Sequence, residues 1–171
     1  LIQDASRSRE ALDRLAPVGQ HLDVLSGGEG ADTLNGGDQN DILFGGAEND
    51  ELAGNADDDF LLGGEGADTY RFNTGDGKDT IIDADAAGAI YYDGILLTGG
   101  TLAAGTEAGS GVYVSDDGIF EYHYSQYNDS ITVSRVDGQG AEGDSITIRN
   151  VSGYVDAQSI PHGTGDLNSC L

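Results

Sequence analysis

The chain has 171 residues, and its 31 acidic side chains against 7 Lys and Arg give a formal net charge of −24 at pH 7. This charge predicts no nucleic-acid partner and no contact with anionic membranes, because like charges repel. The single cysteine, Cys170, excludes an internal disulfide and a zinc site built on several thiolates. High charge with 28 glycines is typical of disorder, but the order of the residues predicts a folded repeat.

The first predicted element is a short helix at residues 4–16, DASRSREALDRLA. Asp4 or Ser6 can cap its start, and Pro17 follows its end. Solenoid folds need covered ends, so we expect residues 1–17 to form an N-terminal capping helix over the segment that follows. A membrane-binding helix is the alternative, but the segment is short and weakly apolar.

Residues 18–83 repeat nine at a time. Five units run without a gap from residue 27 to 71: GGEGADTLN, GGDQNDILF, GGAENDELA, GNADDDFLL and GGEGADTYR. Weaker units lie at 18–26 and at 74–82, the second after the extra residues Phe72 and Asn73. The sixth position is always aspartate: Asp23, Asp32, Asp41, Asp50, Asp59, Asp68 and Asp79. The eighth is always large and apolar: Leu25, Leu34, Leu43, Leu52, Leu61, Tyr70 and Ile81.

Each repeat position has a physical role. Paired glycines permit positive φ and therefore a tight turn, which presents carbonyl oxygens beside the aspartate. The three residues after the aspartate can form a short strand with the eighth residue pointing inward. Two units make one coil, so aspartates 18 residues apart are expected to stack. A flexible Gly/Asp linker is the alternative, but it does not explain an apolar residue at every eighth position.

Stacked carboxylates repel one another unless a cation neutralises them. Carboxylate and carbonyl oxygens are the ligands that Ca²⁺ takes, in flexible geometry with six to eight donors. Zinc and copper favour His or Cys, and magnesium demands a stricter octahedron. The repeat therefore predicts calcium as the bound ion.

The pattern GGxGxDxUx resembles the calcium-binding repeat of the RTX (repeats-in-toxin, hemolysin-type) family. This resemblance implies an all-β fold: a right-handed parallel β-roll over residues 18–83, with an N-terminal capping helix and a C-terminal antiparallel β capping region. In the family, one turn supplies the carbonyls of its second and fourth positions and its aspartate. The turn two units on supplies the carbonyls of its first and third positions and its own aspartate.

Carried onto this chain, the family pattern implies three calcium sites. The first would use Gly28, Gly30 and Asp32 with Gly45, Ala47 and Asp50. The second would use Gly37, Gln39 and Asp41 with Gly54, Ala56 and Asp59. The third would use Gly46, Glu48 and Asp50 with Gly63, Glu65 and Asp68. Outer pairs, Asp23 with Asp41 and Asp59 with Asp79, would raise the number to five. Glycine is replaced at Gln39, Glu48, Asn55 and Asp57, which leaves carbonyl ligation possible.

Residues 84–160 predict a β-rich flank. Seven of the eight tyrosines lie beyond residue 90, in alternating runs such as GIFEYHYS and DSITVSRV. The segment resembles the flank that caps RTX repeats, and we expect antiparallel strands with Phe120, Tyr122 and Tyr124 on one face. A glycan or host-surface ligand could bind these tyrosines, although strand aromatics usually pack in a core. Residues 161–171 predict a flexible tail.

No catalytic signature is present in the sequence. His21, His123 and His162 are scattered, without the spacing of a metalloenzyme, and no nucleophile elbow or P-loop occurs. We therefore expect no enzymatic activity in this segment, although the parent protein could be an enzyme. The resemblance implies a calcium-binding module of a secreted, extracellular bacterial protein that leaves through a type I channel and folds on calcium. The alternatives are a polysaccharide- or cell-surface-binding module of an adhesin, and the non-catalytic C-terminal part of a toxin, protease or lipase.

Overall fold

The computed structural model describes residues 2–4, 22–83, 88–103, 111–125 and 127–149, and all regular structure in them is β-strand. The repeat contains β2 (Val24–Glu29), β3 (Thr33–Gly37), β4 (Ile42–Ala47), β5 (Glu51–Asn55), β6 (Phe60–Glu65), β7 (Thr69–Phe72) and β8 (Lys78–Ile82). Before it lies β1 (Ile2–Asp4). After it lie β9 (Ala89–Tyr92), β10 (Ile95–Leu96), β11 (Thr101–Leu102), β12 (Val112–Val114), β13 (Phe120–Ser125), β14 (Ser130–Arg135) and β15 (Ser145–Arg149).

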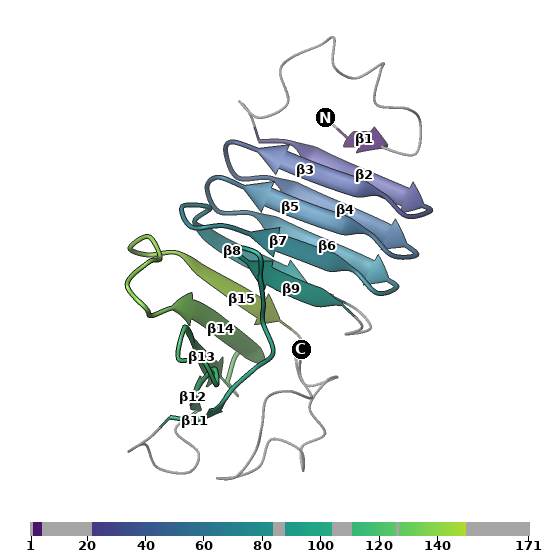
Figure 1. Ribbon diagram of the computed structural model, residues 1–171. Helices are drawn as coiled ribbons and strands as arrows, with labels where there is room; N and C mark the ends of the chain where they lie inside the picture. Colours follow the sequence, from purple (N-terminus) through teal and green to yellow (C-terminus); the bar gives the residue numbers. More distant parts are fainter. Residues whose placement is uncertain (1, 5–21, 84–87, 104–110, 126, 150–171) are drawn as a thin grey trace.

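The repeat forms a parallel β-roll of two facing sheets (Figure 1). Strands β2, β4, β6 and β8 pair in parallel in one sheet, and β3, β5, β7 and β9 pair in parallel in the other. Because consecutive strands alternate between the sheets, two units complete one coil. Leu43 pairs with Leu25 and with Leu61, each 18 residues away. The all-β roll predicted from the sequence is confirmed.

The core of the roll is built from the eighth position of each unit. Leu43, Leu52 and Leu61 are 0% exposed, and Tyr70 and Ile81 are 1% exposed. Their neighbours at the seventh and ninth positions point outward, because side chains alternate along a strand. Full burial of such a side chain contributes about 1.5–3 kcal/mol, so one inward residue per unit supplies a continuous hydrophobic column.

The two-residue insertion changes the spacing but not the pairing. Phe60 pairs with Thr80, 20 residues away. Phe72 is 2% exposed and extends the core, and Asn73 begins a turn in which its N–H donates to Asp76 Oδ2 at 2.6 Å. The extra length is therefore absorbed between β7 and β8.

The C-terminal flank continues the first sheet. Strand β15 pairs in parallel with β8 and antiparallel with β14, and β14, β13, β12 and β11 follow antiparallel. On β13, Phe120 and Tyr122 are buried and Tyr124 packs against the same core, so the predicted antiparallel region and its aromatic face are confirmed. One hydrophobic core extends from the roll into this flank. The predicted domain boundary between residues 83 and 84 stays a prediction.

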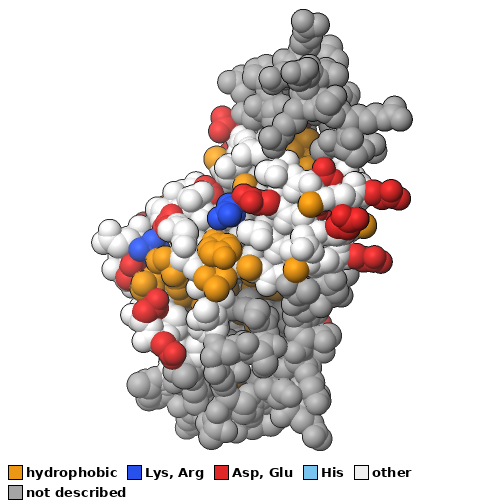
Figure 2. Space-filling view, turned by 45° about the vertical axis from the view of Figure 1, so that its right-hand side comes forward, with side chains coloured by type: hydrophobic (Ala, Val, Ile, Leu, Met, Phe, Trp, Pro, Cys, Tyr) orange, Lys and Arg blue, Asp and Glu red, His pale blue; other side chains and the backbone are white. Residues whose placement is uncertain are grey.

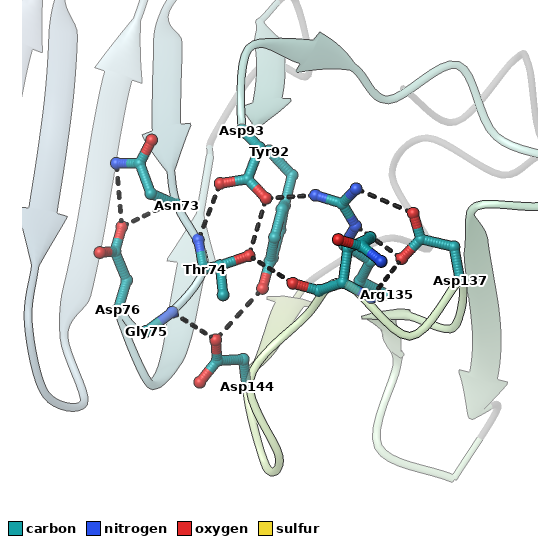
Figure 3. Close-up of polar contacts among 10 residues, drawn as sticks. Asn73, Thr74, Gly75, Asp76, Tyr92, Asp93, Arg135, Asp137 and Asp144 are labelled. Atoms are coloured by element: carbon teal, nitrogen blue, oxygen red, sulfur yellow. Dashed lines mark hydrogen bonds and ion pairs between the residues drawn. The ribbon is translucent and has the colours of Figure 1, made fainter.

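Polar contacts join the last turn of the roll to this cap (Figure 3). Asp144, before β15, accepts hydrogen bonds from the Gly75 N–H at 2.6 Å and the Tyr92 hydroxyl at 3.3 Å. The Thr74 N–H and hydroxyl both donate to Asp93, at 2.8 and 2.7 Å. The inserted turn is thus held by Asp144 from the cap and by Asp93, which follows β9.

Arg135 is the cation of this junction. Its guanidinium is paired with Asp93 and with Asp137, the latter through Nη2 at 2.8 Å (Figure 3). The side chain is only 12% exposed, so the two carboxylates compensate a largely desolvated charge. These contacts link β14 to the loop that follows β9.

The structure does not support the predicted N-terminal capping helix. Asp4 ends a strand, β1, that pairs in parallel with β2, and residues 5–16 lie outside the described residues. The predicted tail at 161–171 lies outside them as well. Within the described part of the chain, no helix is long and apolar enough to cross a membrane.

We predict that removing a core leucine destabilises the roll strongly. Leu43→Ala should lower the free energy of unfolding in excess calcium by about 2–5 kcal/mol, through lost burial and a cavity. The matched control is Leu96→Ala, because Leu96 is 45% exposed. The free energy of unfolding should fall less than half as much in this control as in Leu43→Ala. Urea unfolding followed by circular dichroism measures both, and equal losses would contradict the assigned core.

Candidate metal centre

The aspartates of the repeat form two columns, one at each edge of the roll. On the first edge, Asp32, Asp50 and Asp68 lie in the turns that follow β2, β4 and β6. On the second edge, aspartates lie just before β2, β4 and β6 and inside β8: Asp23, Asp41, Asp59 and Asp79. The strand register therefore stacks aspartates one coil apart, as the repeat predicts.

The turns use positive φ at the second and fourth positions of the unit. Second positions are Gly28, Gly37, Gly46, Asn55 and Gly64, with φ of 101°, 114°, 123°, 74° and 112°. Fourth positions are Gly30, Gln39, Glu48, Asp57 and Gly66, with φ of 101°, 79°, 75°, 77° and 124°. Non-glycine residues hold this conformation at a cost of about 1–2 kcal/mol each. The turn geometry thus persists where glycine is replaced.

The first glycine of each unit is required for space, which corrects the expectation that both paired glycines serve positive φ. A Cβ on Gly36 would lie 2.4 Å from Asp41 Oδ2 and 2.8 Å from the Gly54 carbonyl oxygen. The same convergence recurs at Gly27 with Asp32 and Gly45, and at Gly45 with Asp50 and Gly63. A carboxylate oxygen and a carbonyl oxygen of the next coil therefore meet beside each of these glycines.

One oxygen of each stacked aspartate is bound to the neighbouring coil. Asp41 Oδ1 accepts the Asp23 N–H at 2.6 Å, and Asp59 Oδ1 accepts the Asp41 N–H at 2.7 Å. Equivalent bonds join Asp32 to Asp50, Asp50 to Asp68 and Asp59 to Asp79, at 2.8, 2.9 and 3.0 Å. The 20-residue pair Asp59 and Asp79 therefore keeps the geometry of the inner pairs in spite of the insertion.

The second oxygen has no such partner. Within the part of the chain that the structure describes, the Oδ2 atoms of Asp32, Asp41, Asp50 and Asp59 are buried without a hydrogen-bond partner. An uncompensated buried carboxylate oxygen is costly. The Oδ2 atoms of Asp32, Asp41 and Asp50 each lie near a carbonyl oxygen of the next coil, and such positions suit a cation.

Burial disfavours ionisation of these carboxyls when no cation is present. Burial raises the pKa of Asp59 to about 7, and the nearby charge of Asp41 adds to this effect. Burial likewise raises the pKa of Asp79 to about 8, with a further contribution from the charge of Asp59. Burial also raises the pKa of Asp41 and Asp50. The backbone N–H donors lower each pKa but do not outweigh burial.

The donor chemistry fits a hard cation. No three His, Cys, Asp or Glu side chains come together as a metal site among the described residues, so carbonyl oxygens would complete the shell around each aspartate pair. Two carboxylates with several carbonyls suit Ca²⁺, whereas zinc and copper favour nitrogen or sulfur.

The predicted ligands distribute between the two edges. Those of the first and third sites lie on the first edge: Gly28, Gly30, Asp32, Gly45, Gly46, Ala47, Glu48, Asp50, Gly63, Glu65 and Asp68. Those of the second site lie on the second edge: Gly37, Gln39, Asp41, Gly54, Ala56 and Asp59. The structure brings each set together across one coil, and its role as a ligand set stays a prediction.

A second ladder, at the fifth position of the unit, was not foreseen. Asn49 Oδ1 accepts the Ala67 N–H at 2.8 Å, and Asn40 Oδ1 accepts the Asp58 N–H at 3.3 Å. Asp58 Oδ1 in turn accepts the Lys78 N–H at 3.0 Å. The recurrence of Asn or Asp at this position in the middle units was the available signal.

The aspartate column on the second edge ends in a changed residue. There, β15 places the buried Ile146 beside Asp79, where the next aspartate would stand. This column therefore stops where the cap begins. On the first edge, the Tyr70 hydroxyl donates a hydrogen bond to Asp83 Oδ2 at 3.0 Å.

Residues 19–52, 36–70 and 44–81 match the family model described as the RTX calcium-binding nonapeptide repeat. The repeat segment belongs to the RTX calcium-binding family. No curated protein matches the chain. The chain is similar to the solution structure of the AlgE6R3 subunit from the Azotobacter vinelandii mannuronan C5-epimerase, with 28% identity and a TM-score of 0.49 over 85% of this chain and 80% of that one.

We predict that acid stabilises the metal-free RTX roll. A carboxyl with a raised pKa in the folded state stabilises that state when protonated. This contribution is fully present below the ordinary pKa of 3.8 and is lost as pH rises through about 7 to 8, the values for Asp59 and Asp79. In chelator, circular dichroism should show more β-structure at about pH 5 than at about pH 8.

The variant Asp79→Asn should reduce this pH dependence, because it removes one of the two carboxyls with the highest pKa. The control is Asp38→Asn, because Asp38 is exposed; this variant should leave the pH dependence unchanged. If the circular dichroism of the parent chain in chelator did not vary with pH, the conclusion that burial raises the pKa of these aspartates would be contradicted.

Proposed function

We propose that this segment is a calcium-binding RTX module of a secreted bacterial protein, which folds when it binds calcium outside the cell. The observation that carries the proposal is the set of buried aspartate Oδ2 atoms without hydrogen bonds on both edges of the roll. Membership of the repeat segment in a calcium-binding family supports the same conclusion.

The aspartate pairs would hold the ions. Asp32 with Asp50 and Asp50 with Asp68 would bind two on the first edge, and Asp41 with Asp59 would bind one on the second. The carbonyl oxygens of Gly45, Gly54 and Gly63 support these sites, because each lies beside the same glycine as the carboxylate oxygen of the preceding coil. The outer pairs, Asp23 with Asp41 and Asp59 with Asp79, would extend the number to five.

Calcium would couple to folding through electrostatics and chain entropy. Without the ion, stacked carboxylates repel, and the glycines gain conformational freedom in the open chain. With the ion, the free energy of binding becomes free energy of folding. Extracellular calcium modules work at about 10⁻⁴ to 10⁻³ M, far above cytosolic levels, which fits a chain exported unfolded and folded outside. In this proposal the segment is not itself catalytic, and any enzymatic activity belongs to the parent protein.

A glycan-binding role for the tyrosine-rich flank has less support. Tyr92, Tyr113 and Tyr122 are at most 4% exposed, so they serve packing. Tyr91 lines a groove of about 360 Å³, but its ring lies against the Arg71 guanidinium at 5.3 Å. That guanidinium is already paired with Glu51 at 2.6 Å, so the groove offers no unpaired cation to an acidic sugar.

The first test of the proposal is the dependence of folding on calcium. At neutral pH in chelator, we expect the circular dichroism of an open chain, and β-structure should appear cooperatively as calcium reaches about 10⁻⁴ to 10⁻³ M. Magnesium at the same concentration is the control and should produce little change. A β-rich spectrum that chelator leaves unaltered would refute the coupling of folding to calcium.

The second test is the stoichiometry of aspartate variants. Asp50 belongs to two of the predicted sites and Asp32 to one, so Asp50→Ala should remove two calcium ions per chain and Asp32→Ala one. Equilibrium dialysis at saturating calcium measures both losses against the parent chain. Equal losses from the two variants would contradict the stacked arrangement of ligands.

A further inference from the structure

The two sheets of the roll present very different outer faces. In β3, β5, β7 and β9 the outward residues are mostly polar or small: Thr33, Asn35, Glu51, Ala53, Thr69, Arg71, Ala89 and Tyr91. In β2, β4, β6 and β8 they include six apolar side chains, which we name the apolar face: Val24, Ile42, Phe44, Phe60, Leu62 and Ile82. The repeat requires neither set, because outward positions contribute nothing to the core or to the aspartate columns.

The six side chains form one continuous surface. The register places Ile42 between Val24 and Phe60, and it places Leu62 between Phe44 and Ile82. Phe44 is 40% and Phe60 is 46% exposed, and the other four are half-buried. Two exposed phenylalanines on adjacent strands are the kind of aromatic anchor that dominates binding energy in protein interfaces.

The charge around the apolar face is negative. Exposed acids lie at one edge, where Glu29 and Glu65 end β2 and β6 and Glu48 follows β4, and precede the strands at the other edge, at Asp38, Asp57 and Asp58. Figure 2 shows acidic side chains projecting along the right-hand side of the repeat. The outward positions of β2, β4 and β6 carry no Lys or Arg, whereas the exposed Lys78 on β8 and Arg149, beside Ile82 on β15, mark the end of the surface.

We propose that the apolar face is a docking site for a cationic amphipathic helix of another protein. A second copy of this chain is disfavoured, because its own acidic rim would face this one. A partner with apolar residues on one side and Lys or Arg on its flanks matches both the centre and the rim.

The dimensions fit a short helix. Four adjacent strands, each about 4.8 Å apart, place the outer rows of the apolar face about 14 Å from one another. A helix rises about 1.5 Å per residue and is about 10 Å wide with its side chains, so roughly ten residues cover the face. The inference rests on the proposed function only in that the roll must be folded, and it does not depend on any particular set of calcium ligands.

The test uses the full chain in saturating calcium and a synthetic helix of Leu and Lys, about 18 residues long, that contains one Trp. Because the chain has no Trp, the peptide's fluorescence reports binding directly. A peptide of the same pattern with Glu in place of Lys is the matched probe. The double variant Phe44→Thr/Phe60→Thr keeps strand-forming residues while it removes the aromatic anchors. Tyr127→Thr is its control, because Tyr127 is 97% exposed and lies outside the apolar face.

We expect the Lys peptide to bind the parent chain and the Tyr127→Thr variant equally, and the double variant at least tenfold more weakly. The Glu peptide should not bind, and added salt should weaken the Lys peptide. Equal binding to the double variant, binding of the Glu peptide, or no binding at all would overturn the proposal. So would a dimer in analytical ultracentrifugation that the double variant abolishes, because it would assign the face to a second copy. Circular dichroism of each variant in calcium shows that the roll is folded, and failure of the parent to fold would count against the proposed function instead.

Discussion

The main physical constraint on the structure is the burial of stacked carboxylates at the edges of the roll. Asp41, Asp50 and Asp59 are at most 3% exposed, and each gives one oxygen to the N–H of the coil before it. The other oxygen faces inward without a hydrogen bond. Hydrogen bonds alone do not offset the burial of these groups, as the raised pKa of Asp59 shows. A bound cation would resolve this conflict, because its charge compensates the buried carboxylates.

This constraint explains why the glycines of the repeat are not equivalent. Positions with positive φ accept Gln39, Glu48 and Asn55, at a strain of about 1–2 kcal/mol each, although a Cβ on Gly46 or Gly64 would also lie close to a carbonyl oxygen of the coil before it. The first position is glycine in all five consecutive units. A Cβ there would meet a carboxylate oxygen and, at three of the units, a carbonyl oxygen of the next coil. Backbone and ligand oxygens cannot yield as a flexible side chain can.

The repeat constrains the interior and the edges of the roll but leaves its outer surface free to vary. The same seventh and ninth positions carry Phe44 and Phe60 on one sheet and Arg71 and Glu51 on the other, so the two faces are suited to different surroundings. The ends are also specified outside the repeat. Ile146 closes one aspartate column, and Arg135 and Asp144 attach the cap to the inserted turn. The module is therefore a regular scaffold with individual faces and ends.

The sequence by itself determined the roll, the stacking of aspartates and the choice of a hard cation, because a nine-residue period fixes which side chains return to the same place after one coil. It also predicted the antiparallel cap and the inward face of Phe120 and Tyr122. Only the tertiary structure decided what depends on contacts between distant segments. It showed that β1 pairs with β2, that β15 joins the roll in parallel beside β8, and that the apolar residues at outward positions gather on a single sheet. No local pattern encodes these pairings, since they follow from which edge is free once the coils have stacked.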